Sequence, residues 1–306
     1  MYKRILITGA NGLLGQKLTD AFSNDRTYDL LVTARQENAY NQTSSFGYMT
    51  LDLCQRGDVK ELIWNYSPDV IINAAAFTDV DGAERDKENS WKANVTSVEN
   101  LIAAARLVGA KLVHVSTDYV FDGKSGPYDE VSLPNPLSYY GKGKLASENA
   151  VRAANDNWII VRTMVVYGIA EKVKKNFAIW LAQKLGNGEP VTIVDDQIGN
   201  ATLADDLARG IYELVNQNRK GLYHISGPEI ISRYEFAKLL ANAFGYDPLL
   251  IKPIKTADLN QLAPRPLRSG LITLKAESEL GIRFLSTPES LSIFRDQYLK
   301  HFQPKH

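Results

Sequence analysis

Short apolar runs alternate with helical patterns along the first half of the chain. The apolar runs predict strands at residues 4–8, 30–32, 69–73, 111–115 and 158–161. Apolar positions recur at helical spacing at residues 13–22, 58–66, 90–108 and 138–154. The strand runs lack polar alternation, which is typical of a parallel sheet covered by helices on both faces. We therefore predict an α/β fold built on a doubly wound parallel (Rossmann) sheet.

The regular alternation of strand and helix patterns ends at about residue 165. Helices are expected at 174–186, 203–217 and 232–244, between short extended pieces at 191–194 and 222–225. Prolines gather at positions 248, 253, 264 and 266. This pattern predicts a sheet domain over residues 1–165 and a smaller C-terminal α/β domain over 166–306. Later segments such as 203–225 could pack back onto the first domain.

Composition narrows the class of protein. Lys plus Arg and Asp plus Glu balance at 35 each, so no field of one sign attracts nucleic acid or acidic lipid. Cys54 is the only cysteine, and the four histidines are scattered without an HExxH pattern, so no metal ligand is predicted. No apolar stretch reaches the roughly 20 residues that span a bilayer. The first apolar run breaks at Thr8-Gly9, too early for a signal peptide. We expect a cytoplasmic protein without a membrane partner.

Three glycines follow the first predicted strand and open the first predicted helix. Gly9 would allow a tight turn, Gly12 a close backbone approach to a pyrophosphate, and Gly15 close packing of helix on strand. Free N–H groups at the helix start would then bind the phosphates of a dinucleotide. A purely structural turn is the alternative, and a P-loop is excluded because no Gly-Lys-Ser/Thr follows. The GxxGxxG spacing resembles that of extended short-chain dehydrogenase/reductases.

The end of the second strand bears on the choice of cofactor. An acidic residue there would bind the adenosine ribose and repel a 2′-phosphate. This chain instead has Thr33-Ala34-Arg35, and Arg35 could pair with a phosphate or point to solvent. NADP(H) is therefore favoured and NAD(H) is the alternative. The superfamily resemblance implies that Asp52 bonds the adenine amine and that Leu53 packs on its ring.

A Tyr-x-x-x-Lys pair can supply the proton that carbonyl reduction requires. A Tyr of lowered pKa would donate the proton, while a Lys one turn later would favour the phenolate and hold the nicotinamide ribose. Among 15 tyrosines, Tyr140 with Lys144 and Tyr234 with Lys238 fit this spacing. Tyr140 opens the helix after the fourth strand, where it can reach the carboxyl edge of the sheet. Tyr234 lies in a helix with a core-like face, so we interpret that pair as structural.

A hydroxyl at the end of the fourth strand should complete the site. Ser116 and Thr117 both stand there, and either could hydrogen-bond the oxygen of a substrate and help stabilise an alkoxide.

Longer segments carry a more specific resemblance. Residues 116–123 read STDYVFDG, 73–84 read NAAAFTDVDGAE and 134–148 read PNPLSYYGKGKLASE; residues 162–168, 176–177, 196–199 and 265–266 fit the same pattern. The chain resembles the dTDP-4-dehydrorhamnose reductase family over nearly its whole length. This resemblance implies that Thr117, Tyr140 and Lys144 form the catalytic triad and that Asp118 contacts a sugar nucleotide. The sequence departs from the family at Val165, where a Trp is usual, and at Ala201, where a Pro is usual.

The complete set of predicted site residues follows from these motifs and the resemblance. The cofactor residues are expected to be Gly9, Asn11, Gly12, Leu13, Leu14, Gly15, Arg35, Asp52, Leu53, Ala74, Ala75, Ala76, Tyr140 and Lys144. The substrate residues are expected to be Thr117, Asp118, Val165, Asn176, Gln197 and Arg265.

The implied activity is reduction of a nucleotide-linked 4-keto-6-deoxysugar, most specifically dTDP-4-dehydrorhamnose to dTDP-L-rhamnose. One alternative is a sugar-nucleotide epimerase or dehydratase, although Tyr119 stands where a dehydratase usually has Glu after Asp118. The other is a non-catalytic NADP-binding regulatory subunit, because a relative of these reductases serves a methionine adenosyltransferase in that way. A homodimer is a further expectation.

Overall fold

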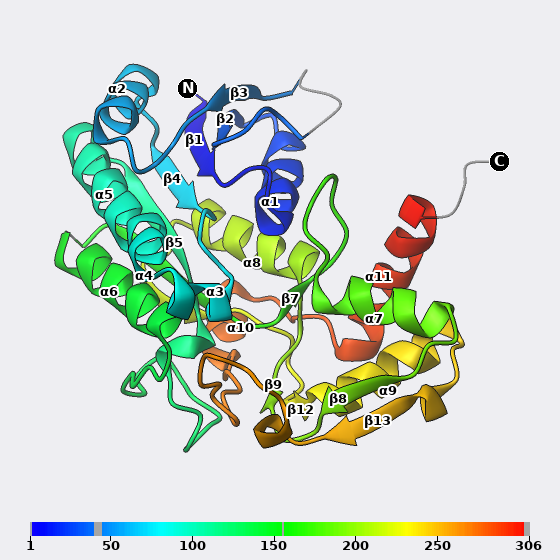
Figure 1. The fold of residues 1–306 in the computed structure, drawn as a ribbon. Coiled ribbons are helices and arrows are strands. Elements are labelled where there is room, and N and C mark those ends of the chain that lie inside the picture. Colours follow the sequence, from blue (N-terminus) through cyan, green and yellow to red (C-terminus); the bar gives the residue numbers. More distant parts are fainter. Residues whose placement is uncertain (1, 40–44, 155, 303–306) are drawn as a thin grey trace.

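A seven-stranded parallel sheet forms the centre of the computed structural model, which describes residues 2–39, 45–154 and 156–302 (Figure 1). Its spatial order is β11-β6-β5-β4-β1-β2-β3. The strands are β1 (Lys3–Thr8), β2 (Tyr28–Ala34), β3 (Gly47–Thr50), β4 (Val70–Asn73), β5 (Lys111–Thr117), β6 (Trp158–Thr163) and β11 (Gly221–His224). The chain order reverses between β1 and β4, which creates a crevice at the carboxyl ends of these two strands.

Helices cover both faces of this sheet, as the unbroken apolar strands predict. Helices α1 (Leu13–Ser23) and α8 (Ala204–Asn216) lie on one face, and α2 (Arg56–Tyr66), α5 (Ser97–Val108) and α6 (Tyr139–Ala154) lie on the other (Figure 1). Successive β1 side chains alternate between the two cores: Ile5 and Ile7 join the α1 side, while Leu6 joins the α2 side. The prediction of a doubly wound α/β fold is confirmed.

The single helix expected over residues 90–108 is wrong in detail. The structure has α3 (Val80–Arg85), α4 (Lys87–Trp91), a π-helix at Lys92–Thr96 and only then α5. The Asn94 side chain exchanges two hydrogen bonds with the backbone of Phe77, at 2.8 and 3.0 Å. Asn94, which lies in the π turn, thus ties this helix to the segment after β4.

The C-terminal part builds a second core, seen at the lower right of Figure 1. Helices α7 (Phe177–Gly186), α9 (Arg233–Phe244) and α11 (Thr287–Phe302) surround the parallel pair β8 (Val191–Val194) and β13 (Ile251–Ile254). Two further pairs connect this part to the sheet domain: β7 (Val166–Tyr167) with β10 (Thr202–Leu203), and β9 (Ile198–Gly199) with β12 (Ile231–Ser232).

Residues 204–224 return to the large sheet. Helix α8 packs beside α1, and β11 pairs in parallel with β6, with Tyr223 opposite Val161. The α10 helix (Leu274–Leu280) contributes Ala276 and Leu280 to the same core. The sheet domain is therefore completed by residues from the second half of the chain.

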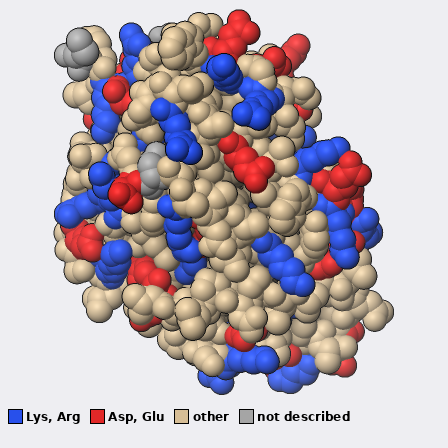
Figure 2. Space-filling model, turned by 90° about the vertical axis from the view of Figure 1, so that its left-hand side faces the viewer, with Lys and Arg blue, Asp and Glu red and all other residues tan. Residues whose placement is uncertain are grey.

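Among the elements that the pattern does not predict are β3, α3, α10 and α11. Strand β3 lies at the sheet edge and is mostly exposed, so its sequence carries little apolar signal. No helix in the described part of the chain is both long and apolar enough to cross a membrane. On the face shown in Figure 2, basic and acidic side chains are intermixed, as the balanced composition suggests.

Candidate active site

Two adjoining cavities lie at the carboxyl ends of the central strands. They measure about 460 and 580 Å³. Both are lined by Asn11, Gly12, Ala74, Ala75, Ala76, Thr78 and Lys174. They therefore form one continuous groove across the point where the strand order reverses, which is where doubly wound sheets bind their ligands.

The glycine loop forms the floor of this groove. Gly9 has a φ of +73°, and a Cβ there would lie 2.6 Å from the backbone N of Ala75. A Cβ on Gly15 would lie 2.1 Å from the carbonyl oxygen of Gly9. Only glycine fits at these two positions, because other residues would push the loop away from β4 and α1 away from the loop.

The N-terminus of α1 is prepared for an anion. Gly12, which has no side chain to cap the helix, is its N-cap, and the first turn carries no acidic residue. The N-cap residue therefore offers no acceptor to the first N–H groups of the helix. These groups face the groove and can bind a phosphate. Leu13 and Leu14 line the larger cavity at the same place.

The smaller of the two cavities would hold the adenosine half of a dinucleotide. Arg35 lies exposed at its edge, and Asp52 and Leu53 line its wall. The Asp52 carboxylate accepts a 3.0 Å hydrogen bond from the backbone N–H of Cys54. Cys54 and Lys174 line the same cavity, although no motif singles them out.

The larger cavity brings Thr117, Tyr140 and Lys144 together. Thr117 ends β5, whereas Tyr140 and Lys144 lie one turn apart at the start of α6. All three are buried, and Lys144 Nζ donates a 2.7 Å hydrogen bond to the carbonyl oxygen of Val115. The structure thus brings together the three residues that the motifs single out.

The surroundings of Tyr140 correct one expectation. Burial, reinforced by the nearby Asp118 carboxylate, raises the pKa of Tyr140, although a hydrogen bond with Thr117 works in the opposite direction. The predicted lowering of this pKa is therefore wrong, because burial disfavours the charged phenolate. The phenol stays protonated at neutral pH, as a proton donor must.

The hydroxyl next to Tyr140 belongs to Thr117. The Ser116 hydroxyl donates a 2.6 Å hydrogen bond to Glu148 of α6 and is therefore directed towards that helix. Thr117 donates a 3.0 Å hydrogen bond to Asp118, which in turn accepts one of 2.6 Å from Ser269. Burial raises the pKa of Asp118 to about 6 despite these bonds.

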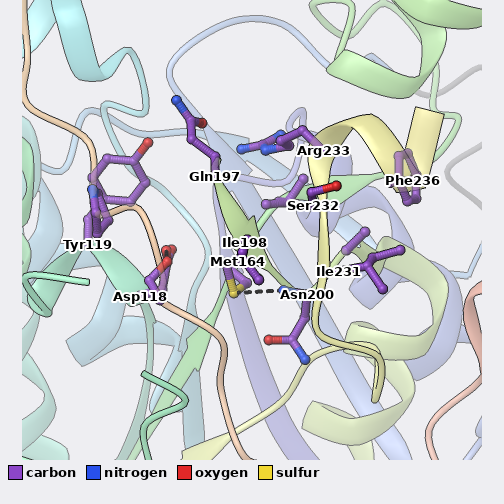
Figure 3. A pocket seen from close by; sticks show the side chains of 15 residues that line it. Asp118, Tyr119, Met164, Gln197, Ile198, Asn200, Ile231, Ser232, Arg233 and Phe236 are labelled. Atoms are coloured by element: carbon purple, nitrogen blue, oxygen red, sulfur yellow. Dashed lines mark hydrogen bonds between the residues drawn. The ribbon is translucent and has the colours of Figure 1, made fainter. Parts of the chain in front are cut away.

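A third cavity of about 60 Å³ continues from Asp118 towards the C-terminal core (Figure 3). Val165 lines both this cavity and the larger one, and Gln197 also lines the third cavity. Val165 has a φ of +45°, which is rare for a β-branched residue. Backbone strain of this kind concentrates at functional sites.

Asn176 and Arg265 have structural partners. Asn176 caps α7 by accepting a 3.1 Å hydrogen bond from Ile179 N, and it also lines the larger cavity. Arg265 forms a 2.9 Å ion pair with Asp81 and lies 5.9 Å from the centre of the Tyr119 ring. Arg265 therefore lies next to Tyr119 and lines none of the three cavities described above.

Arg233 is a site residue that the sequence does not single out. It begins α9, and Figure 3 shows its guanidinium between Gln197 and Ser232 at the third cavity. Within the described residues this guanidinium has a ring contact with Phe177 and no salt bridge. Burial lowers its pKa, and Arg265 adds to this effect while Tyr119 and Asp118 oppose it. A cation in this position is suited to an anionic ligand.

The second Tyr-x-x-x-Lys pair lies away from these cavities. Lys238 Nζ is 5.6 Å from the centre of the Tyr234 ring, and Tyr234 packs on the C-terminal core. This arrangement agrees with a structural role for the pair.

Comparisons with known proteins extend over almost the whole chain. A family model described as the RmlD substrate binding domain matches residues 3–299. The dTDP-4-dehydrorhamnose reductase of Aggregatibacter actinomycetemcomitans is 33% identical over 292 residues, covering 92% of this chain and 94% of that protein. The methionine adenosyltransferase 2 subunit beta of Xenopus tropicalis is 35% identical over 289 residues, covering 92% and 83%.

A solved structure of a reductase is also similar to this chain over almost its whole length. The crystal structure of dTDP-4-dehydrorhamnose reductase from Bacillus anthracis in complex with NADP aligns with a TM-score of 0.83 and 30% identity, covering 96% of this chain and 99% of that chain. Fold and length thus agree across the comparison. The chain belongs to the RmlD substrate binding domain family.

Proposed function

We propose that this protein is an NADPH-dependent reductase of a nucleotide-linked 4-keto-6-deoxysugar, most specifically of dTDP-4-dehydrorhamnose to dTDP-L-rhamnose. The observation that carries the proposal is the single cavity that joins Tyr140, Lys144 and Thr117 to the glycine loop. The reductases of the family support the choice of substrate, and the NADP complex of the Bacillus anthracis protein supports the choice of cofactor. NAD(H) is the alternative cofactor.

The residues of the groove fit a dinucleotide. The uncapped start of α1 and the glycine loop, where a Cβ would clash, suit the pyrophosphate. Arg35 would bind the 2′-phosphate, and Asp52 and Leu53 the adenine. When bound, the nicotinamide supplies the hydride for the sugar C4 carbonyl. Tyr140 donates its proton to the oxygen at C4, Thr117 hydrogen-bonds that oxygen, and Lys144 stabilises the phenolate that remains.

The decisive experiment is NADPH oxidation by the purified protein with dTDP-4-keto-6-deoxysugars, with NADH in parallel. We expect turnover with NADPH and a weaker reaction with NADH. Product analysis at C4 then identifies the sugar formed. Absence of oxidation with every ketosugar nucleotide would overturn the proposal.

The two alternatives predict different results in the same assay. A non-catalytic regulatory subunit would bind NADPH without oxidising it and would co-purify with an enzyme. The similar protein of Xenopus tropicalis is named as a subunit, methionine adenosyltransferase 2 subunit beta. An epimerase or dehydratase would retain NAD⁺ after purification and convert its substrate without net NADPH oxidation. The complete Thr117, Tyr140 and Lys144 set favours the reductase.

Two domain roles follow from the proposal. Residues 1–165, completed by the returning segment 204–224, would bind the cofactor, and the rest of residues 166–306 would bind most of the sugar nucleotide. A homodimer and a cytoplasmic location stay predictions.

Arg35→Gln is expected to raise the KM for NADPH about tenfold, because one charge-assisted hydrogen bond to the 2′-phosphate is lost. The KM for NADH should stay unchanged, since NADH lacks that phosphate. Steady-state kinetics with both cofactors measure this difference. Arg56→Gln is the control, because Arg56 is also exposed but lines neither half of the groove. Equal effects of Arg35→Gln on both cofactors would contradict the assigned role.

Arg233→Gln is expected to raise the KM for the sugar nucleotide about 10- to 100-fold, because its guanidinium would bind the substrate phosphates. The KM for NADPH should not change. Lys238→Gln is the matched control, since Lys238 is an exposed cation on the same helix. A larger effect on NADPH than on the sugar nucleotide would place Arg233 in the cofactor site instead.

A further inference from the structure

A chain of buried polar groups runs beneath Lys144, on the side away from the cavity. The Thr8 hydroxyl donates a 2.7 Å hydrogen bond to Asn73 Oδ1. Asn73 Nδ2 lies 3.2 Å from His114 Nδ1, and His114 Nε2 lies 2.9 Å from the Ser147 hydroxyl. These residues come from β1, β4, β5 and α6, and all four are almost fully excluded from solvent. Neither the motifs nor the reaction described above gives the chain a role.

The orientation of Asn73 is set by its neighbours. Its Oδ1 accepts from the Thr8 hydroxyl and, at 3.2 Å, from the backbone N–H of Ala75. A backbone N–H can only donate, so the oxygen of the amide must face Ala75. The Nδ2 group of Asn73 therefore faces His114 and donates to Nδ1.

This orientation selects one tautomer of His114. Burial, together with the charge of Lys144, lowers the pKa of His114 well below its ordinary value, so the ring is neutral. Because Nδ1 accepts from Asn73, the ring proton must be on Nε2. The Nε2–H donates to the Ser147 hydroxyl, whose own proton is directed at 2.8 Å to the carbonyl oxygen of Lys144.

Lys144 thus faces a donor where an acceptor would be expected. Its Nζ lies 3.2 Å from His114 Nε2, the atom that carries the ring proton. An ammonium can only donate, so it gains no hydrogen bond from this nitrogen and meets the positive end of an N–H dipole. Its acceptor on this side is the carbonyl oxygen of Val115, at 2.7 Å.

We propose that His114 is a positioning residue: held as the Nε2–H tautomer by Asn73, it places the positively polarised Nε2–H group, and no acceptor, beside the Lys144 amine and makes that amine easier to deprotonate. This role rests on the proposed reductase reaction, in which Lys144 stabilises the tyrosine phenolate and must later exchange its proton. An amine that releases its proton near neutral pH can take part in restoring Tyr140 after each turnover.

The charges around Lys144 agree with this role. Burial lowers the pKa of Lys144 to about 8, and the carboxylate of Glu148 on the same helix opposes the shift. The other titratable groups that line the cavity are Asp118, Tyr119 and Tyr140, together with the lysines of segment 172–175. Burial thus brings the pKa of the Lys144 amine closer to neutral pH.

Two variants of matched polarity test the proposal. His114→Gln can place an amide N–H near the position of Nε2, and the Ser147 hydroxyl, which already donates, selects that N–H over the amide oxygen. His114→Asn is shorter, so it can satisfy Asn73 but leaves no N–H facing Lys144. The Lys144 midpoint is measured as the pH dependence of its acetylation by acetic anhydride, followed by peptide mass spectrometry. The pH profile of kcat/KM for the ketosugar is measured beside it.

We expect His114→Asn to move the Lys144 midpoint upward by about one pH unit, the usual size of such environmental shifts, and His114→Gln to stay near the wild type. The alkaline limb of the kcat/KM profile should move with it. Unchanged midpoints in both variants, or equal shifts in both, would overturn the role of His114. The labelling needs no turnover, so it tests His114 even where wild-type protein fails to oxidise NADPH and the proposed function is rejected.

Discussion

Tyr140→Phe is expected to reduce kcat about 100- to 10,000-fold, the range that general-acid residues contribute. The substitution removes only the hydroxyl that would donate the proton, while the ring can keep its edge-to-face contact with Tyr119, at 5.6 Å between ring centres. Binding of NADPH should persist, since the glycine loop and Lys144 are intact. Single-turnover NADPH oxidation and fluorescence titration with NADPH measure the two properties separately.

Tyr234→Phe is the matched control for this prediction. Tyr234 begins the other Tyr-x-x-x-Lys pair but packs on the C-terminal core, so its hydroxyl has no access to the groove. We expect full turnover from this variant. Unchanged turnover in Tyr140→Phe would remove Tyr140 from the mechanism, and equal losses in both variants would indicate a general effect on folding.

Glu148→Gln is expected to lower the free energy of unfolding by about 3–5 kcal/mol, because it leaves buried positive charge without its partner. The Glu148 carboxylate accepts from Arg162 at 2.7 and 2.9 Å, from Arg152 at 2.8 Å and from Ser116 at 2.6 Å. Glu148 and Arg162 are almost completely buried. These bonds attach α6 to β5 and β6, so the variant should also loosen the helix that carries Tyr140 and Lys144.

Glu88→Gln provides the comparison. Glu88 pairs with Lys92 at 2.6 Å, one turn along the helix, but both side chains are mostly exposed. Such a pair contributes little to stability, because solvent screens both charges. Urea unfolding of the two variants should separate them clearly. Similar unfolding midpoints would mean that the buried network does not hold α6 in place.

The local pattern was enough for the central features of the fold. Strand β1, the glycine loop and α1 follow one another within 21 residues, and each has a clear signal of its own. The start of α6 also has a clear local signal, because a single turn of helix is enough to place Tyr140 and Lys144 side by side. Their position after β5 then follows from the right-handed crossover that parallel strands require.

Other parts of the site carry no such local signal. Strand β11 joins β6 across about 60 residues of chain, and β3 is too exposed to show an apolar pattern. Arg233 reaches the third cavity, next to Asp118, only because β12 pairs with β9 and brings α9 beside Gln197. The π-helix before α5 likewise depends on the contact between Asn94 and Phe77.

The sequence by itself therefore determined the α/β class, the position of the glycine loop and the helical spacing of Tyr140 and Lys144. Only the tertiary structure decided that burial raises the pKa of Tyr140, that Arg233 faces the site, and that His114 lies beneath Lys144 as a donor. The physical reason is the range of the forces involved. Helix and strand periodicity act between near neighbours in the chain, whereas desolvation, tautomer choice and charge pairing depend on groups that only the folded sheet brings together.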